Sequence, residues 1–288
     1  MAEFKPSKSK EEWASRLIVP LYNEGYIETL WNARKPYHRE HGFTLKASGK
    51  WALWFFNMRP AGSSPELFYD ICTSMAEMII VHREQKELDM LIGVEMAGIP
   101  PVGAVSRAMY NLGYPMKFGY TRPLPKKVMS PIECLELLRK IDANVTGYSN
   151  KEYVEGRLEW ATNVGILDDM ATNLGSKIIA RLIVLWQAGL RNTSVVCNQI
   201  FYFLNRTRGN IQKGIDFVNE TESGLYPASL DVNYIIEMDD HLAELKTVMK
   251  PGEFEWFTEF QKNSKQFDGS EDGLRNRREA LAAAARGL

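Results

Sequence analysis

Apolar residues follow two alternating patterns over the middle of the chain. Segments in which apolar residues recur every three or four positions predict helices, and short continuous apolar runs between them predict strands. The predicted strands lie in DMLIGVE, YPMKFGYTR, NVGILDD, TSVVCNQIFYFLN and LYPASLDV. Alternation of strands and helices is typical of βαβ units, and strands without strict polar alternation suit a parallel sheet covered on both faces. The pattern predicts an α/β fold with a doubly wound, mostly parallel sheet.

Three further segments lie outside this alternation. Apolar spacing within 1–42 predicts an N-terminal helical extension, and the stretch FTLKASGKWALWFFN from Phe43 predicts a hairpin around a Ser-Gly turn. Residues 123–155 combine loop residues with a short helix and predict a lid inserted between two strands. Residues 251–288 predict a tail of extra helices. We therefore expect an extension at 1–42, a main domain at 43–250 and a C-terminal helical tail.

Composition limits the kind of ligand. The 288 residues include 35 lysines and arginines and 36 aspartates and glutamates, which give a formal net charge of −1. No general positive field therefore draws the chain to nucleic acid or to an acidic membrane surface, and an anionic ligand must be met by locally placed charges. We expect a small-molecule ligand, with neither nucleic acid nor membrane as a partner.

The start of the chain and its three cysteines bear on its location. The stretch MAEFKPSKSKEEW lacks the apolar core of a signal peptide, and no apolar run reaches the roughly 18 residues of a membrane span. Cys72, Cys134 and Cys197 lie far apart and include no C-x-x-C, so they support neither a disulfide framework nor a cysteine zinc site. We expect a cytoplasmic protein.

The strongest candidate for chemistry is NVGILDDMATNLGSK, in which an apolar strand ends in Asp168 and Asp169. Ligands of open α/β sheets bind beyond the carboxyl ends of the strands, and a loop that turns into a helix N-terminus presents free N–H groups to a phosphate. Thr172 to Ser176 would form that phosphate loop. Because successive strand side chains point to opposite faces, the two aspartates would hold different ligand groups, such as two hydroxyls. Alternatively, these residues only form a turn and a helix cap.

The stretch ILDDMATNLGS resembles the 5-phosphoribosyl 1-pyrophosphate (PRPP) binding motif of type I phosphoribosyltransferases. Other segments narrow the family to orotate phosphoribosyltransferases: FTLKASGKWALWFFN resembles their N-terminal segment and DMLIGVEMAGIPP their pyrophosphate loop. Further on, YTRPLPKK resembles the start of their mobile catalytic loop, and FLNRTRGNIQKGIDF resembles a D-R-x-x-G stretch. All of these occur in the family's order between Phe43 and Leu242. The resemblance implies the type I phosphoribosyltransferase fold with an N-terminal hairpin hood.

The resemblance also implies an activity and a set of site residues. Orotate phosphoribosyltransferases join orotate to PRPP, which gives orotidine 5'-phosphate and pyrophosphate for pyrimidine nucleotide synthesis. Asp168 and Asp169 would hold the ribose hydroxyls and, through these or through water, the cofactor Mg2+. Arg122 and Lys126 occupy the spacing of the loop arginine and the catalytic lysine. The residues assigned to PRPP are Glu95, Ala97, Gly98, Ala171, Thr172, Asn173, Leu174, Gly175 and Ser176.

Four residues fall where the family contacts the pyrimidine, namely Lys46, Phe55, Phe56 and Arg206. They would supply a stacking surface and cationic groups for the carboxylate of orotate. Displacement of pyrophosphate builds positive charge on the sugar and negative charge on the leaving group, so Mg2+ and loop cations are needed to neutralise the latter. A closing lid keeps water from the reacting carbon. In the family this lid reaches the neighbouring subunit, which implies a homodimer.

The chain departs from the family's pattern at three places. Leu174 stands where the family usually has glycine, which puts a Cβ near the phosphate and predicts a slightly altered loop. Asn205 replaces the usual aspartate before Arg206. After Lys126 the catalytic loop lacks a His-Gly pair, and a long insertion precedes the next strand, so we expect no intact proton donor there.

These departures leave two alternative functions open. One is a phosphoribosyltransferase that uses another nucleobase, and the other is a non-catalytic, PRPP-binding regulatory protein. Lys126 and Lys127 could also be solvated loop charges. We interpret Trp51 and Trp54 as core residues of the hairpin without a ligand role.

Two other groupings have no predicted function. His38 and His41 are spaced like metal ligands, but surface histidines on amphipathic helices are commoner than two-ligand sites. Asp239, Asp240 and His241 resemble a hydrolytic group, but their neighbours are apolar at helical spacing. We therefore predict that these three residues form a solvent-exposed face.

Overall fold

The computed structural model describes residues 3–45, 49–143, 152–207, 211–222 and 229–287. The chain forms two compact units, and each combines segments that lie far apart in the sequence. The larger unit consists of Met1–Lys10 and Tyr69–Ile235, and the smaller unit consists of Glu11–Phe68 and Ile236–Leu288. The division expected from the sequence has its boundaries after residues 42 and 250, and it stays a prediction.

The larger unit contains a six-stranded sheet with the order β10-β9-β8-β5-β6-β7. Strand β5 runs parallel to both β6 and β8, and β8 runs parallel to β9, whereas β7 pairs antiparallel with β6. The strands are β5 (Met90–Gly93), β6 (Lys117–Thr121), β7 (Val154–Glu155), β8 (Asn163–Ala171), β9 (Val196–Asn205) and β10 (Asp231–Glu237). The predicted α/β fold with a mostly parallel sheet is confirmed. The edge strand β7 was not predicted and lies in the segment 123–155.

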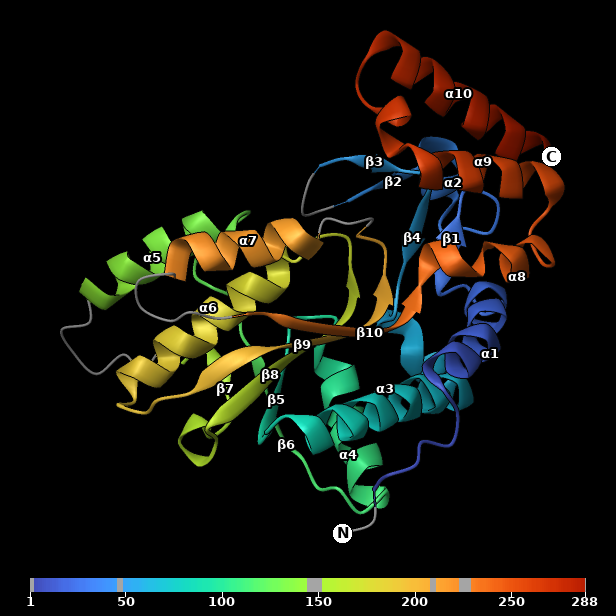
Figure 1. Cartoon of the computed structure of the whole chain (residues 1–288). Coiled ribbons are helices and arrows are strands. Elements are labelled where there is room, and N and C mark those ends of the chain that lie inside the picture. The colour runs from blue at the N-terminus through green and yellow to red at the C-terminus, as the bar shows by residue number, and fades with distance from the viewer. Residues whose placement is uncertain (1–2, 46–48, 144–151, 208–210, 223–228, 288) are drawn as a thin grey trace. The chain divides into compact units, whose positions relative to one another are not determined.

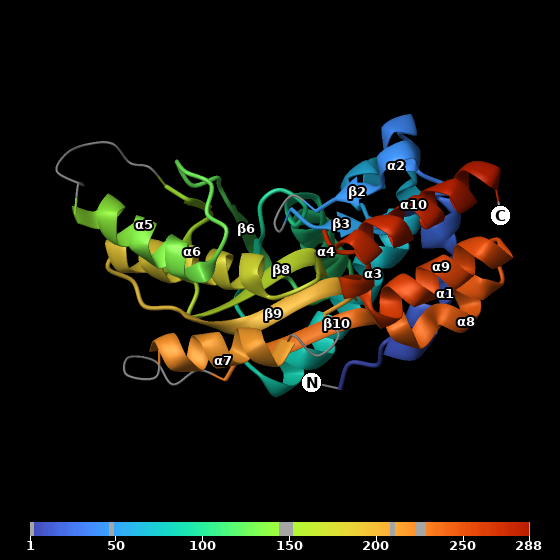
Figure 2. The ribbon, with the colours of Figure 1, turned by 90° about the horizontal axis from the view of Figure 1, so that it is seen from above.

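Helices cover both faces of this sheet, as a doubly wound fold requires (Figure 1). Helices α3 and α4 lie on one face, and α5, α6 and α7 lie on the other, as Figure 2 shows from above. Their bounds are α3 (Pro65–Gln85), α4 (Ile99–Asn111), α5 (Pro131–Ala143), α6 (Gly175–Leu190) and α7 (Ile211–Glu222). Each of these helices coincides with a segment that the apolar spacing predicts to be helical.

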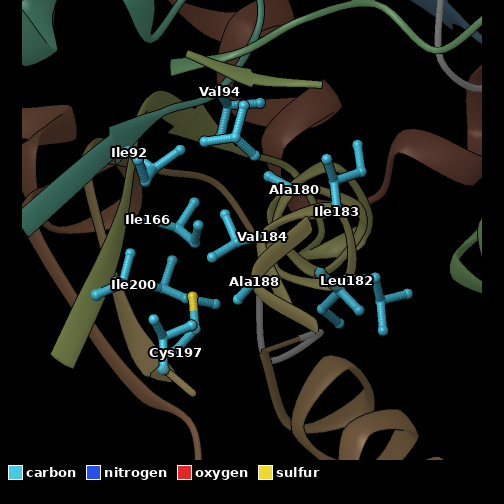
Figure 3. Close-up of a cluster of buried hydrophobic side chains, with 14 of the residues drawn as sticks. Ile92, Val94, Ile166, Ala180, Leu182, Ile183, Val184, Ala188, Cys197 and Ile200 are labelled. Atoms are coloured by element: carbon cyan, nitrogen blue, oxygen red, sulfur yellow. The ribbon is translucent and has the colours of Figure 1, made fainter. Parts of the chain in front are cut away.

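The core of the larger unit lies between the sheet and α6 (Figure 3). Ile92, Ile166 and Ile200 come from three neighbouring strands, and all three are completely buried against Val184 and Ala188 of the helix. Burial of one such aliphatic side chain stabilises the fold by about 1.5–3 kcal/mol. This packing holds α6 against the sheet, and the same core includes Ala171 and Leu174, next to the candidate phosphate loop.

The smaller unit has two short antiparallel ladders. Strand β2 (Phe43–Thr44) pairs with β3 (Trp51–Ala52), which confirms the predicted hairpin, and β1 (Ile27–Thr29) pairs with β4 (Trp54–Phe56). The helices of this unit are α1 (Lys10–Asn23), α2 (Pro36–His41), α8 (Leu242–Lys246), α9 (Pro251–Lys262) and α10 (Glu271–Arg286). Helix α1 buries the apolar face that its spacing predicts. The pairing of β1 with β4 was not predicted.

Buried polar contacts join the two ends of the chain within this smaller unit. The Glu253 carboxylate on α9 is 1% exposed and accepts hydrogen bonds from the Thr29 hydroxyl at 2.5 Å and the Tyr22 hydroxyl at 2.7 Å. Burial, followed by the charge of Glu253, raises the pKa of Tyr22. The indole N–H of Trp54 donates to Gln261 at 3.0 Å. Trp54 is completely buried, which confirms its predicted place in the core.

One prediction for this unit is wrong in part. Asp239 and Asp240 are exposed as expected, but His241 is buried. Its Nδ1 lies 3.0 Å from a carboxylate oxygen of Glu244, so a polar partner accompanies the burial. None of the helices among the described residues has the length and apolarity needed to cross a membrane.

Candidate functional site

The candidate site lies in the larger unit, at the edge where the parallel strands end. The register pairs Gly93 of β5 with Leu167 of β8, and Ala171 of β8 with Asn205 of β9, so the carboxyl ends of these strands meet at one edge. The loops that follow β5, β6, β8 and β9 therefore start close to one another (Figure 1). Ligands of open α/β sheets bind in this position.

Asp168 and Asp169 are both buried in the last part of β8, with 4% and 8% exposure. One oxygen of Asp168 accepts the Asp169 amide at 2.9 Å, and the other lies 2.7 Å from the ammonium of Lys177. Burial, the charge of Asp168 and a hydrogen bond to it raise the pKa of Asp169, and the charge of Lys177 opposes this rise. The two carboxyls therefore differ chemically. Asp168 has a cationic partner, whereas Asp169 holds its proton more strongly than an ordinary aspartate does.

The phosphate loop leads from β8 into a helix of 16 residues. Thr172, Asn173 and Ser176 are exposed, and the Asn173 side chain accepts a hydrogen bond from the Gly175 amide at 3.0 Å. This contact of Asn173 is typical of a turn. It is the contact expected if the loop residues only form a turn and a helix cap. The exposed hydroxyls lie beside the helix N-terminus, whose free N–H groups and partial positive charge suit a phosphate.

The altered loop expected from Leu174 stays a prediction, but the structure shows where the side chain of this residue lies. Its side chain is 1% exposed and belongs to the apolar core, where it contacts Gly214 of α7. A Cβ on Gly214 would lie 2.7 Å from the Cβ of Leu174, which is too close for any side chain. The backbone of Leu174 has φ −85°, which a residue other than glycine adopts without strain. The glycine on α7 thus makes room for the leucine in the loop.

The loop after β5 carries Glu95, Ala97 and Gly98, and neighbouring strands hold it in place. The Glu95 amide donates to the Thr121 hydroxyl at the end of β6, at 3.0 Å. A Cβ on Gly98 would lie 2.5 Å from the carbonyl oxygen of Leu167 in β8, so only glycine fits at this close approach. Burial raises the pKa of Glu95. The structure therefore brings this loop to the same sheet edge as the aspartates.

Arg122 and Lys126 follow directly after β6. The guanidinium of Arg122 forms an ion pair with Glu155 at 3.1 Å, and its amide donates to the Tyr153 carbonyl at 2.8 Å. Both Arg122 and Lys126 are exposed. In the part of the chain that the structure describes, neither contacts the aspartates of β8. Their predicted roles on the leaving group stay predictions.

The predicted base-contacting residues are divided between the two units. Phe55 and Phe56 belong to the smaller unit, Arg206 belongs to the larger one, and Lys46 lies outside the described residues. Phe56 is completely buried, whereas Phe55 is half-buried and stacks on Phe43 with ring centroids 6.2 Å apart. Because adjacent strand residues point to opposite faces, the two phenylalanines cannot both stack on one base. Phe55 is the better candidate.

Arg206 and Asn205 lie at the end of β9, beside the aspartate strand. The Arg206 amide donates to the Ala171 carbonyl at 2.9 Å, and the Arg206 side chain is buried. The side-chain oxygen of Asn205 accepts from the Tyr202 hydroxyl at 3.0 Å and from the Thr207 amide at 3.3 Å. Asn205 thus organises the turn after β9, with an oxygen that the aspartate of the family would also offer.

Sequence reasoning missed Lys177, which lies one residue beyond the PRPP-like motif. Lys177 is 3% exposed, and its ammonium contacts Asp168, the Met170 carbonyl and, at 3.2 Å, the Ser176 hydroxyl. A lysine in the first turn of a helix has the charge that the helix dipole disfavours. A lysine at the start of a predicted helix, directly after a phosphate-type motif, is therefore the sequence signal that identifies Lys177.

The side chains around Asp168 and Asp169 determine how Mg2+ can bind at this site. No cluster of three or more histidine, cysteine, aspartate or glutamate side chains suited to a metal exists among the described residues. Lys177 moreover occupies the cation position beside Asp168. Mg2+ is usually held by one or two carboxylates together with substrate phosphates and water. The residues therefore fit an ion that arrives with a phosphorylated ligand and is completed by Asp169, and they do not form a resident metal cage.

Known proteins resemble this chain in sequence and in structure. No protein-family model matches the chain. An orotate phosphoribosyltransferase of Bradyrhizobium sp. (strain BTAi1) is 26% identical over 140 residues, which cover 45% of this chain and 74% of the relative. The matches to three such curated relatives span between 61% and 74% of the relatives' lengths.

Two solved structures share the arrangement of the elements. Leishmania donovani UMP synthase has a TM-score of 0.56 at 16% identity and covers 84% of this chain and 40% of its own. Orotate phosphoribosyltransferase from Francisella tularensis has a TM-score of 0.52 at 14% identity. The match covers 86% of this chain and 98% of that protein. The chain is similar to orotate phosphoribosyltransferases in sequence and in fold. It has the type I phosphoribosyltransferase fold, and the resemblance seen in the sequence is confirmed.

Proposed function

We propose that this chain transfers the phosphoribosyl group of PRPP to orotate and releases pyrophosphate. The observation that carries this proposal is the pair of buried carboxyls, Asp168 and Asp169, that leads directly into the exposed phosphate loop at the start of α6. The hydroxyls of a sugar phosphate would meet the two carboxyls, and its phosphate would meet the loop that follows them. The relationship to orotate phosphoribosyltransferases supports orotate as the acceptor.

Each loop at the sheet edge has a part in this reaction. Asp169 would accept a ribose hydroxyl, while Thr172, Ser176 and the amides of the first turn of α6 would bind the 5-phosphate. The loop that includes Glu95 and Gly98 would bind the pyrophosphate, and its contact with Thr121 supports its place at this sheet edge. These contacts would hold the anomeric carbon in place for attack by the ring nitrogen of orotate.

The reaction breaks the bond between the anomeric carbon and the pyrophosphate oxygen. Negative charge builds up on that oxygen, so cations that approach it favour the transition state over the bound substrate. Arg122 and Lys126 are exposed cations of the loop after β6, and Mg2+ carried by the pyrophosphate would add to them. Arg206, at the end of β9 beside the aspartate strand, would receive the carboxylate of orotate.

Two further features belong to the proposal. The loop that begins with Arg122 would close over the site and keep water away from the reacting carbon. In orotate phosphoribosyltransferases this loop serves the neighbouring subunit, so we propose a homodimer. A cytoplasmic location fits the reaction and also stays a prediction.

A screen of pyrophosphate release tests the proposal. The chain is mixed with PRPP and Mg2+ and then with orotate, uracil, adenine or hypoxanthine, or with no base. Release that requires orotate is expected. Release with another base would overturn the acceptor assignment in favour of a different nucleobase. Calorimetric binding of PRPP without release on any base would instead favour the regulatory alternative.

A further inference from the structure

Lys177 has an unusual position for a lysine, because it is buried in the first turn of α6 beside the candidate phosphate loop. The helix dipole and the loss of water both disfavour a charged ammonium there. The protein offsets this cost with three oxygens around Nζ, from Asp168 at 2.7 Å, from Ser176 at 3.2 Å and from the Met170 carbonyl. Three oxygen partners around one buried ammonium indicate that Lys177 has a specific role.

The three partners of Nζ lie on both sides of the phosphate loop. Asp168 and Met170 belong to β8, where the loop begins, and Ser176 belongs to α6, where it ends. An ammonium has three donors, and the protein itself uses all three. Lys177 thus links the two ends of the loop and keeps no donor for a ligand.

The same contacts separate the roles of the two aspartates. Both oxygens of Asp168 have partners within the protein, namely Lys177 and the Asp169 amide. One oxygen of Asp169 accepts the Met170 amide at 2.7 Å, and within the described residues Asp169 has no ion pair. Asp168 is therefore the anchored carboxylate, and Asp169 is the one available to a ligand.

We propose that Lys177 is a positioning residue for PRPP: it links Asp168 and the end of β8 to the start of α6, so that the loop holds its binding shape and Asp169 faces the ribose. This inference rests on the proposed function, in which the loop binds PRPP. Lys177 touches neither the substrate nor the reacting atoms, and its effect passes through Asp168 and the loop backbone.

The test compares the wild type with Lys177→Met, Lys177→Arg and the double variant Asp168→Asn/Lys177→Met. Lys86→Met is the matched control, because Lys86 forms an exposed ion pair with Asp231 in the same unit. PRPP affinity is measured by calorimetry with Mg2+, well below the melting temperature of every variant. Hydrogen exchange of the Thr172–Ser176 amides is measured without ligand, as a readout that is independent of activity.

Lys177→Met should weaken PRPP binding about tenfold or more, which corresponds to one hydrogen bond to a charged group. The loop amides should exchange faster, whereas those of Ile166 and Ile200 in the core strands should not. The double variant should bind PRPP more tightly than Lys177→Met, because it leaves no unpaired buried carboxylate. Lys177→Arg should recover part of the affinity, and Lys86→Met should bind like the wild type.

Three results would overturn the inference, and they can be told apart. If the wild type binds PRPP and Lys177→Met binds it equally well with unchanged loop exchange, Lys177 only stabilises the fold and the positioning role is wrong. If the wild type itself does not bind PRPP, the proposed function fails and the inference fails with it. A double variant that binds no better than Lys177→Met also contradicts the linkage through Asp168.

Discussion

The two units of this chain are built in opposite ways. The larger unit largely follows the chain in order, because β5, β6, β8 and β9 each lead into a helix of the same unit. The smaller unit takes one segment from each end of the chain, and buried polar contacts such as Thr29 with Glu253 and Trp54 with Gln261 join them. Order along the chain thus explains the first unit, and contacts distant in sequence explain the second.

The two units also differ in which of the predicted site residues they hold. Every loop with a predicted role toward PRPP belongs to the larger unit, where parallel strands bring their carboxyl ends together without any special contact. Of the site residues that the resemblance assigns and the structure describes, the smaller unit holds Phe55 and Phe56. Changes of the exposed loop cations in the larger unit should therefore affect rates, whereas changes in the smaller unit should affect local stability.

The largest effect should come from Lys126→Ala in the larger unit. Loss of a cation that meets the developing charge of the leaving group should lower kcat about 100- to 1000-fold, with a much smaller change in PRPP affinity. Lys126 is exposed, so the melting temperature should stay the same. Steady-state release of pyrophosphate gives kcat, and Lys127→Ala is the matched control. A loss of activity that is equal in both variants would leave Lys126 without a specific role.

Glu253→Ala should have the next largest effect, and it should be confined to the smaller unit. The change leaves the Tyr22 and Thr29 hydroxyls without their acceptor, at a cost of about 2–4 kcal/mol in local stability. Hydrogen exchange should show lost protection in β1 and α9 and retained protection in β8. The exposed Glu255→Ala on the same helix is the control. Equal loss of protection in β8 would mean that the two units unfold together.

A pair of changes tests the packing under the phosphate loop. Gly214→Ala should destabilise the protein by about 1–3 kcal/mol, because the new Cβ would meet the Cβ of Leu174 at 2.7 Å. When Leu174→Gly is also present, the sign should reverse, since alanine is about 1 kcal/mol better than glycine within a helix. Urea unfolding of the four variants in the cycle measures both effects. The same cost for Gly214→Ala in either background would contradict the packing.

The last expected effect is a pH dependence of the stability that arises from Asp169. Burial and the charge of Asp168 raise the pKa of this carboxyl to about 8, so between its unfolded value of 3.8 and that value the folded state binds more protons. Its contribution to stability is therefore greatest at low pH and is lost as pH rises toward 8. Asp169→Asn should remove this slope from urea unfolding, whereas the exposed Asp216→Asn should keep it. An unchanged slope in Asp169→Asn would show that Asp169 has an ordinary pKa.

The sequence predicts the larger unit well because its information is local. Apolar spacing shows the helices and the main strands, and the motif around Asp168 marks the sheet edge where the loops meet. Partners distant in sequence were not predictable in the same way. Nothing in the spacing links Leu174 to Gly214, or β7 to β6, because those contacts form only after the chain has folded.

The smaller unit shows the same limit more strongly. The hairpin of Phe43 with Ala52 follows from a short turn, but the pairing of β1 with β4 and the contacts of Glu253 have no local pattern. Lys177 is an intermediate case. It stands beside a motif that the sequence reveals, yet its bond to Asp168 depends on the turn between β8 and α6.

The central claim is that PRPP and orotate react on this chain. The most direct measurement follows the absorbance of orotate in a mixture of protein, Mg2+ and PRPP, with the product identified by mass. Orotate should be consumed, orotidine 5'-phosphate and pyrophosphate should appear in equal amounts, and Lys126→Ala should slow the formation of both. An unchanged absorbance at high protein concentration, with PRPP intact, would contradict it.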